Sequence, residues 1–478
     1  MTEFLSRIPT QHHIGGRWVG DPTLEVTDPA TGEVLATVAD ADVQTAVSAL
    51  DAAVAAAESW AATRPRERGE ILRRAFEGII ARQEEFARLM TLEMGKPLAE
   101  ARGEVAYGAE FFRWFSEEAV RLHGRYGQAP LSGQRIVTEP KPVGPVFAIT
   151  PWNFPLAMGT RKIGPALAAG CTVVVKPASA TPLTTLLLME VLVEAGLPDG
   201  VVNVFTSSNS RDTSAALIGD RRLRKLTFTG STPVGKGLLR LAADNVLRCS
   251  MELGGNAPFI VLEGADVDLA VQGALVAKMR NNGEACTAAN RFFLHESLAG
   301  EFLDKLGRAL DDWPVGPGIA DGTKLGALIS KQAVAEIIEL VDDAVAQGAT
   351  LVRGGRAPEG PGAFLEPTIL TGVPITSRIA HEEIFGPVVA AQTFSEVDDV
   401  VARANATDFG LMSYVFGAEG EALRVAGRLE YGMAGINTGL ASDAAAPFGG
   451  VKHSGLGREG SFEGIAEYVE TRYYALPG

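Results

Sequence analysis

The chain has 478 residues, of which 46% are hydrophobic and 21% are charged, and its formal net charge is −15. A chain of this length exceeds what one hydrophobic core usually supports, so we expect a globular protein of at least two domains. The acidic balance argues against nucleic acid and anionic membrane as partners, because both bind basic surfaces.

The N-terminal quarter is predicted to be mostly helical. Short strands broken by turns are expected between residues 14 and 29. Apolar residues then recur at helical spacing over residues 40–61, 65–94 and 97–122. Residues 124–144 alternate in polarity and carry proline and glycine, which predicts an excursion of extended chain.

Cysteine usage and the start of the chain predict a cytoplasmic protein. The three cysteines are Cys171, Cys249 and Cys286, and an odd, sparse set fits a reducing compartment. No two are spaced as C-x-x-C, so no metal site is expected. The first residues lack the basic region and apolar core of a signal peptide. The longest apolar run, residues 163–175, is too short to span a bilayer.

From residue 145 onward, strands and helices alternate, which predicts two α/β units. In the first unit we expect strands at 145–150, 172–176, 201–205 and 225–229, with helices at 182–195 and 234–245. In the second we expect strands at 259–262 and 291–294 and a helix at 331–347. Continuous apolar strands separated by helices indicate a parallel sheet covered on both faces. Ligands of such sheets bind at the carboxyl ends of the strands.

Two segments could hold an anionic ligand. Residues 230–235, Gly-Ser-Thr-Pro-Val-Gly, follow a strand and precede a helix, where backbone N–H groups favour negative charge. Taken alone, this segment also fits a turn with an N-cap hydroxyl. Lys176, at the end of another strand, is the second candidate. The formal G-x-G-x-x-G at 455–460 follows a polar loop instead of a strand, so we reject it as a dinucleotide fingerprint.

Cys286 is the candidate nucleophile. Acyl chemistry at a carbonyl carbon requires a soft nucleophile, a base and an oxyanion donor, and Cys286, Glu252 and Asn153 supply a thiol, a carboxylate and an amide. A free cysteine is often a small buried hydrophobe. The neighbours Gly283 and Glu284 do not resemble an apolar core strand, which favours the catalytic interpretation.

Six motifs in one order resemble the aldehyde dehydrogenase superfamily, and the resemblance covers essentially the whole chain. They are Pro-Trp-Asn-Phe-Pro at 151–155, Phe-Thr-Gly-Ser-Thr at 228–232, Glu-Leu-Gly-Gly at 252–255, the Cys286 segment, Glu-Glu-Ile-Phe-Gly-Pro at 382–387 and Pro-Phe-Gly-Gly at 447–450. Within the superfamily, residues 160–162, 286–291, 435–439 and 454–461 most resemble the succinate-semialdehyde dehydrogenase family.

The resemblance implies an α/β fold in three parts. A Rossmann-variant dinucleotide-binding domain is expected over residues 1–126 and 144–252, and an α/β catalytic domain over 253–458. Residues 127–143 and 459–478 are expected to form a small β oligomerisation element, which implies a homodimer or homotetramer.

The resemblance also implies the chemistry. The Cys286 thiolate adds to an aldehyde, while the Asn153 amide and the Cys286 backbone N–H stabilise the oxyanion. Hydride transfer to a nicotinamide leaves a thioester, which water activated by Glu252 hydrolyses to a carboxylic acid. The expected cofactor is NAD or NADP, and the residues implied in binding it are Thr150, Pro151, Trp152, Lys176, Ser179, Gly230, Ser231, Gly235, Leu253, Glu383 and Phe385. NAD-preferring relatives often carry Glu where this chain has Ser179, so NADP is favoured.

The expected substrate is succinate semialdehyde, gripped at its far carboxylate by Arg161, Arg291 and Ser442, with Phe448 beside it. Each arginine alone also fits a structural ion pair. The alternatives are glutarate semialdehyde and medium-chain or aromatic aldehydes, for which both arginines would be structural. A CoA-acylating enzyme is disfavoured by Glu252, and a silent scaffold by the intact set of Cys286, Glu252 and Asn153.

Overall fold

A computed structural model describes residues 2–478, and its largest sheet has eight strands. Their spatial order is β19 (Gly455–Leu456), β11 (Arg248–Glu252), β10 (Lys225–Thr229), β7 (Val146–Ile149), β8 (Val173–Lys176), β9 (Val202–Val204), β1 (His12–Ile14) and β2 (Arg17–Val19). The five strands from β11 to β9 are parallel, whereas β19 and β1 join them antiparallel. This arrangement is the parallel sheet predicted from the apolar runs.

Helices cover both faces of this sheet because both faces are apolar. Along β7, Val146 and Ala148 pack in one buried cluster, and Phe147 and Ile149 in another, as the two-residue period of a strand requires. The first cluster includes residues of α3 (Pro65–Ala81), α4 (Gln83–Met94), α5 (Leu98–Glu118), α6 (Ala157–Ala169) and α7 (Leu183–Glu194). The second includes residues of α2 (Val43–Ala62), α8 (Ser210–Gly219) and α9 (Thr232–Ala243).

The second sheet has seven strands. Their order is β14 (Thr350–Arg353), β15 (Thr368–Thr371), β16 (Val388–Phe394), β13 (Ala289–His295), β12 (Ala257–Val261), β17 (Met412–Phe416) and β18 (Met433–Ile436). All neighbours are parallel except β14 and β15. The helices of this part are α10 (Val267–Ala274), α11 (Ala299–Asp311), α12 (Lys331–Ala346), α13 (Val397–Asn405) and α14 (Glu419–Ala426).

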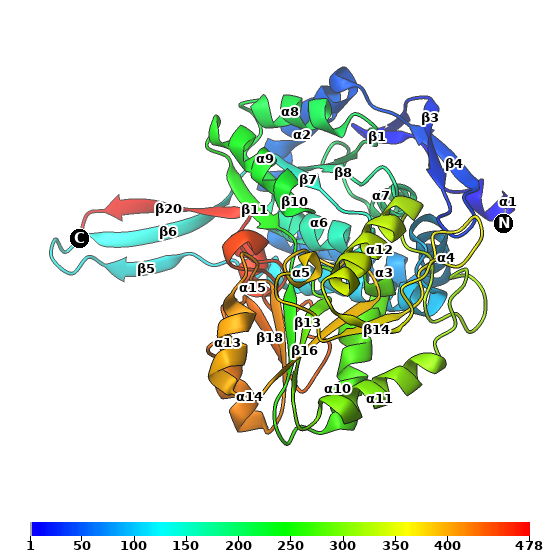
Figure 1. Cartoon of the computed structure of the whole chain (residues 1–478). Helices are drawn as coiled ribbons and strands as arrows, with labels where there is room; N and C mark the ends of the chain where they lie inside the picture. Colours follow the sequence, from blue (N-terminus) through cyan, green and yellow to red (C-terminus); the bar gives the residue numbers. More distant parts are fainter. Residues whose placement is uncertain (1) are drawn as a thin grey trace.

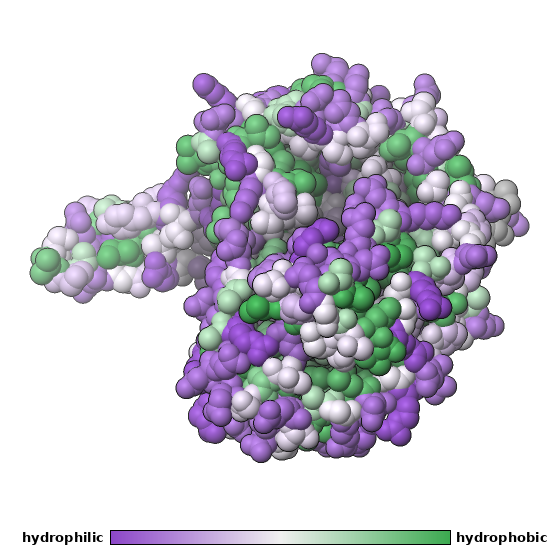
Figure 2. All heavy atoms as spheres, in the orientation of Figure 1, coloured by the Kyte–Doolittle hydropathy of each residue, from purple (hydrophilic) through white to green (hydrophobic). Residues whose placement is uncertain are grey.

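A third sheet projects from the body of the molecule as an arm (Figure 1). It contains β20 (Val469–Leu476), β6 (Arg135–Pro142) and β5 (Arg125–Gln128), so it joins the chain end to a hairpin over 300 residues earlier. Apolar residues are visible along it in Figure 2, and Leu131 in its hairpin turn is 99% exposed. A two-stranded sheet of β3 (Pro22–Thr27) and β4 (Val34–Ala39) and the short helix α1 (Thr2–Leu5) lie near the N-terminus.

Four details differ from the predicted elements. The helix expected over 65–94 is two helices, because the backbone leaves helical values at Arg82 (φ −106°, ψ 24°). Strand β11 was missed, since its sequence Arg-Cys-Ser-Met-Glu shows no apolar run. β19, expected in the second unit, pairs with β11 of the first sheet. Residues 461–466, expected in the oligomerisation element, form α15 (Ser461–Ala466), which contacts α5 and α6. Within residues 2–478, no helix is both long enough and apolar enough to cross a membrane.

Candidate active site

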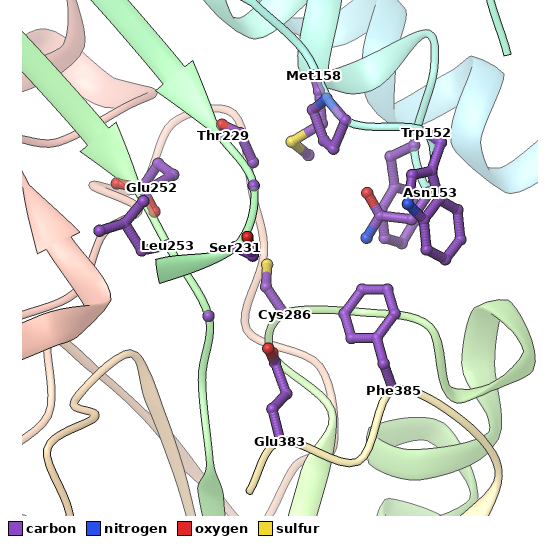
Figure 3. Close-up of a pocket in the computed structure, with 14 residues that line it drawn as sticks. Trp152, Asn153, Met158, Thr229, Ser231, Glu252, Leu253, Cys286, Glu383 and Phe385 are labelled. Carbon is purple, nitrogen blue, oxygen red and sulfur yellow. The ribbon is translucent and has the colours of Figure 1, made fainter. Parts of the chain in front are cut away.

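A cavity of about 260 Å³ lies at the carboxyl ends of β7, β10 and β11, facing loops that lead into β13 and β16. All three predicted catalytic residues line it, together with seven predicted cofactor residues (Figure 3). The lining residues are Pro151, Trp152, Asn153, Phe154, Met158, Thr229, Gly230, Ser231, Glu252, Leu253, Gly254, Cys286, Glu383 and Phe385. The loops of the two large sheets therefore meet where the parallel-sheet rule places a ligand.

The Cys286 loop follows an irregular helical stretch, the π-helical turn η1 (Leu275–Met279) and the 3₁₀ turn η2 (Arg280–Gly283). Asn281 and Asn282 adopt left-handed backbone conformations (φ 57° and 59°), which asparagine tolerates better than most residues. On the other side, a Cβ at Gly255 would lie 2.4 Å from the Cys286 carbonyl oxygen. Glycine at this position therefore lets the segment after β11 approach the nucleophile.

Asn153 is held against the nucleophile loop. Its Nδ2 donates a hydrogen bond to the Glu284 carbonyl oxygen at 2.9 Å, two residues before Cys286. A side-chain amide carries two N–H donors, so the second is available to an oxyanion formed on substrate. Figure 3 shows Cys286 between Asn153 on one side and Glu252 on the other.

Burial is the largest influence on the pKa values of Cys286 and Glu252, the predicted nucleophile and base. Burial raises the pKa of the Cys286 thiol to about 12; the positive charge of Arg161 opposes this shift, and the negative charge of Glu252 adds to it. Burial also raises the pKa of Glu252 well above its usual value, and the negative charge of Glu459 adds to the shift. Neither carboxyl oxygen of Glu252 has a hydrogen-bond partner within residues 2–478. Glu252 is thus free to bond a water molecule in the cavity.

Several groups around the cavity fit a dinucleotide. The N-cap residue of helix α9 is Ser231, whose side chain makes no capping hydrogen bond, so the first N–H groups of the helix remain available to a phosphate. The hydroxyls of Thr150 and Thr229 are buried and lack partners within the described chain. Burial lowers the pKa of Lys176 to about 8, and its Nζ donates only to the Pro177 carbonyl, at 3.3 Å. These unsatisfied donors at one sheet edge suit the polar groups of NAD or NADP.

Four predicted cofactor residues lie outside the lining of this cavity: Thr150, Lys176, Ser179 and Gly235. Thr150 and Lys176 are buried at the ends of β7 and β8, and Ser179 is half-buried in the turn after β8. A Cβ at Gly235 would lie 2.4 Å from Leu253, so this glycine allows α9 to pack closely on a cavity residue.

Arg161 on α6 lies beside the cavity. Its guanidinium lies 3.9 Å from the ring centroid of Phe448 and donates through Nη2 to the Tyr107 hydroxyl at 2.7 Å. Its Nη1 is 3.5 Å from the sulfur of Met158, a cavity residue. The Phe448 ring therefore packs against the Arg161 guanidinium. Ser442 lies next to Tyr107. Burial raises the pKa of Tyr107, and the charges of Arg161 and Arg280 and a hydrogen bond with Ser442 oppose this shift.

The structure does not bring Arg291, predicted to bind the substrate, to the cavity. Its guanidinium donates to three backbone carbonyls and one hydroxyl at 2.7–3.2 Å, those of Asn256, Arg403, Ala404 and Tyr431. These partners lie among α13 and the segments flanking β12 and β18. Arg291 therefore ties these elements together and has no donor directed at the cavity.

Arg280 is the cationic residue that sequence reasoning missed. It begins η2, six residues before Cys286, and its guanidinium lies 5.3 Å from the ring centroid of Phe154, which lines the cavity. Its charge lowers the pKa of Cys286 and of Tyr107. Within residues 2–478 its side chain has no hydrogen bond and no ion pair. Its place in the nucleophile loop is the signal that could have identified it.

Comparisons with known proteins agree on one family. Residues 18–474 match the sequence description "Aldehyde dehydrogenase family". A succinate-semialdehyde dehydrogenase of Paenarthrobacter nicotinovorans is 56% identical over 444 residues, 93% of this chain and 99% of that protein. A glutarate-semialdehyde dehydrogenase of Pseudomonas putida is 47% identical, covering 98% of this chain and 97% of that protein.

Solved structures agree with the fold. The crystal structure of a succinate-semialdehyde dehydrogenase from Burkholderia pseudomallei superposes with a TM-score of 0.97 at 46% identity, covering 99% of both chains. That of an NADP-dependent enzyme of Escherichia coli gives a TM-score of 0.97 at 44% identity, covering 98% of both chains. The α/β fold expected from the motifs is confirmed.

Proposed function

Because the chain belongs to the aldehyde dehydrogenase family, we propose that it oxidises succinate semialdehyde to succinate with NADP or NAD. The observation that carries the substrate proposal is the pair of guanidinium groups, Arg161 and Arg280, beside the cavity that holds Cys286. Two guanidinium groups at one end of the site and a thiol at the other end suit a short aldehyde with a distal carboxylate. Ser442 and the Tyr107 hydroxyl supply neutral hydrogen bonds at the same end.

In this proposal Cys286 adds to the aldehyde carbon, and the free N–H of the Asn153 amide stabilises the oxyanion that forms. The positive charges of Arg161 and Arg280 favour the thiolate, because both lower the pKa of Cys286. The bound nicotinamide supplies the acceptor for the hydride. The reacting carbon then remains on Cys286 as a thioester.

Glu252 completes the reaction as the base for hydrolysis. Its unpartnered carboxyl oxygens lie at the end of β11, in the same cavity as the thioester sulfur. A base with a raised pKa accepts a proton from water readily near neutral pH. Glu252 therefore removes the water proton as the water attacks the thioester, which releases the carboxylic acid and restores Cys286.

We propose that NADP is accepted and favoured. Ser179 carries no charge that would repel a 2′-phosphate, and Lys176, three residues earlier at the end of β8, is a cation with a single weak protein partner. Pro151, Trp152, Gly230, Ser231, Leu253, Glu383 and Phe385 are proposed to contact the rest of the cofactor. A related enzyme of Escherichia coli, 45% identical, is named a succinate-semialdehyde dehydrogenase for NADP(+).

The second candidate substrate is glutarate semialdehyde, one methylene longer. It is favoured by the two glutarate-semialdehyde dehydrogenases of Pseudomonas species at 46–47% identity, since one carbon changes the span between thiol and arginines only slightly. A hydrophobic pocket discriminates one methylene by about 1–3 kcal/mol, so both can be substrates at different rates.

A matrix of aldehydes and cofactors tests the proposal. Succinate semialdehyde, glutarate semialdehyde and butanal are each measured with NADP and with NAD, and kcat/KM is taken from the rate of cofactor reduction. We expect succinate semialdehyde with NADP to give the highest value. Equal values for butanal and succinate semialdehyde would refute the carboxylate site.

The arm and the domain division complete the proposal. We propose that residues 1–126 with 144–252 form the dinucleotide-binding domain, 253–458 the catalytic domain, and 127–143 with 459–478 the oligomerisation element. The projecting sheet, with Leu131 fully exposed, supports a homodimer or homotetramer in which it contacts a second copy. The three free cysteines support a cytoplasmic location.

A further inference from the structure

Lys96 is a fully buried lysine that contacts the loop carrying Asn153. Its Nζ pairs with the Glu104 carboxylate and donates to the Asn153 carbonyl oxygen at 2.9 Å. It also lies 4.4 Å from the ring centroid of Phe154. A buried ion pair is often no more stabilising than apolar residues of the same volume, so stability alone does not account for this lysine. Two of these three contacts are with residues 153 and 154 of the loop that carries Asn153.

Glu104 extends the same contact to helix α6. Its Oε1 accepts hydrogen bonds from the backbone N–H groups of Leu156 and Ala157, at 3.0 and 3.1 Å, where α6 begins without a side-chain cap from its own sequence. The helix it caps carries Arg161. One carboxylate therefore joins Lys96, and through it Asn153, to the start of the substrate-facing helix.

Asn281 holds Asn153 from the nucleophile side. Its Nδ2 donates to the Asn153 carbonyl at 3.0 Å and to the Glu284 carbonyl at 2.9 Å. The same Glu284 carbonyl accepts the Asn153 side-chain amide. The Asn153 carbonyl is thus held by two donors, Lys96 and Asn281. The Asn153 side chain is held by the Glu284 carbonyl of the Cys286 loop.

We propose that Lys96, Glu104 and Asn281 are positioning residues that set the Asn153 amide relative to Cys286. They touch neither substrate nor cofactor and act through Asn153, so the inference rests on the oxyanion role proposed for that residue. An oxyanion donor contributes only when it lies within hydrogen-bond distance of the developing charge. A displacement of about 1 Å costs on the order of 10²-fold in rate.

The test uses the full-length enzyme with Lys96→Met/Glu104→Gln, which removes both buried charges together so that neither is left unpaired. The matched control is Glu93→Gln. Glu93 is likewise buried, and its carboxylate accepts the N–H groups of Leu183 and Thr184, at 2.8 and 3.0 Å, at the start of α7. Glu93 therefore shares the capping role of Glu104 without contacting Asn153.

Two rates are measured for each variant: single-turnover cofactor reduction, and alkylation of Cys286 by iodoacetamide, which needs the thiolate but forms no oxyanion. The double variant should lose about 10²-fold in the first rate and nothing in the second. Glu93→Gln should leave both rates unchanged. In an Asn153→Ala background, the double variant should cause no further loss, because residues that act as one unit are not additive.

A loss that multiplies with that of Asn153→Ala, or an equal loss in the alkylation rate, would overturn the positioning role. So would an equal loss in Glu93→Gln. Asn281→Ala provides a neutral variant if the charge variant does not fold, and the same pattern is expected from it. If Asn153→Ala alone keeps the full rate, the proposed oxyanion role fails. If Asn153→Ala is slow but the positioning variants are not, only the present inference fails.

Discussion

Replacing Arg280 with methionine should remove the preference for an aldehyde that bears a carboxylate. The Arg280 side chain is half-buried and has no hydrogen bond or ion pair within residues 2–478, so the change breaks neither kind of contact and removes only the packing on Phe154. A hydrogen bond to a charged group contributes about 1.5–3 kcal/mol. At about 1.4 kcal/mol per factor of ten, kcat/KM for succinate semialdehyde should fall about 10- to 150-fold relative to that for an aldehyde without a carboxylate.

Butanal provides the internal control, because it has the same length and no carboxylate. Loss of the Arg280 charge also raises the pKa of Cys286, which should lower kcat/KM for both aldehydes by the same factor. The ratio between the two aldehydes therefore measures the carboxylate contact directly. Arg291→Met is the comparison variant. It should lower the melting temperature, because several buried carbonyls lose their donor, and it should leave the substrate ratio unchanged. A ratio that changes in Arg291→Met but not in Arg280→Met would refute this reasoning.

Three further outcomes follow from the site. Ser179→Glu places a carboxylate where a 2′-phosphate would bind. Because such a like-charge contact costs several kcal/mol, the NADP-to-NAD ratio of kcat/KM should fall by about 100-fold or more. An unchanged ratio would place the phosphate elsewhere. Glu459→Gln removes a charge that raises the pKa of Glu252, so the acidic limb of the kcat–pH profile should move to lower pH. A shift to higher pH would contradict this interaction between Glu459 and Glu252. Gly255→Ala places a Cβ 2.4 Å from the Cys286 carbonyl oxygen, so thermal stability and kcat should both fall. Wild-type values for both would show that the Cys286 loop can move to accommodate the methyl group without cost.

The sequence was more informative about the proposed reacting groups than about the residues proposed to select the substrate. Cys286, Glu252 and Asn153 could be predicted because each lies in a motif and acyl chemistry needs one of each group. Identifying the arginines proposed to bind the substrate required knowing where their side chains point in the folded chain. Arg291 follows Cys286 by five residues, but it lies on β13, and its side chain is directed at backbone carbonyls outside the cavity. Arg280 lies in an irregular turn whose direction no periodicity predicts.

Secondary structure shows the same distinction. The helices and buried strands that were predicted follow from apolar periodicity, and the structure confirms them with shifts of a few residues, whereas α6, α8 and β15 to β18 were not predicted. The break at Arg82 and the strand ending at Glu252 were not predicted, since neither carries a glycine, a proline or an apolar run at that point. Tertiary contacts decide such segments: β11 is a strand because β10 lies beside it and pairs with it along its whole length.

The most direct test of the account is to trap the thioester on Cys286. Glu252→Gln removes the base for hydrolysis and also a negative charge that raises the pKa of the thiol, so acylation should proceed and deacylation should stop. After mixing with succinate semialdehyde and NADP, mass spectrometry should find one succinyl group on the peptide that contains Cys286, with one equivalent of cofactor reduced. No adduct, or an adduct on Cys171 or Cys249, would contradict the account.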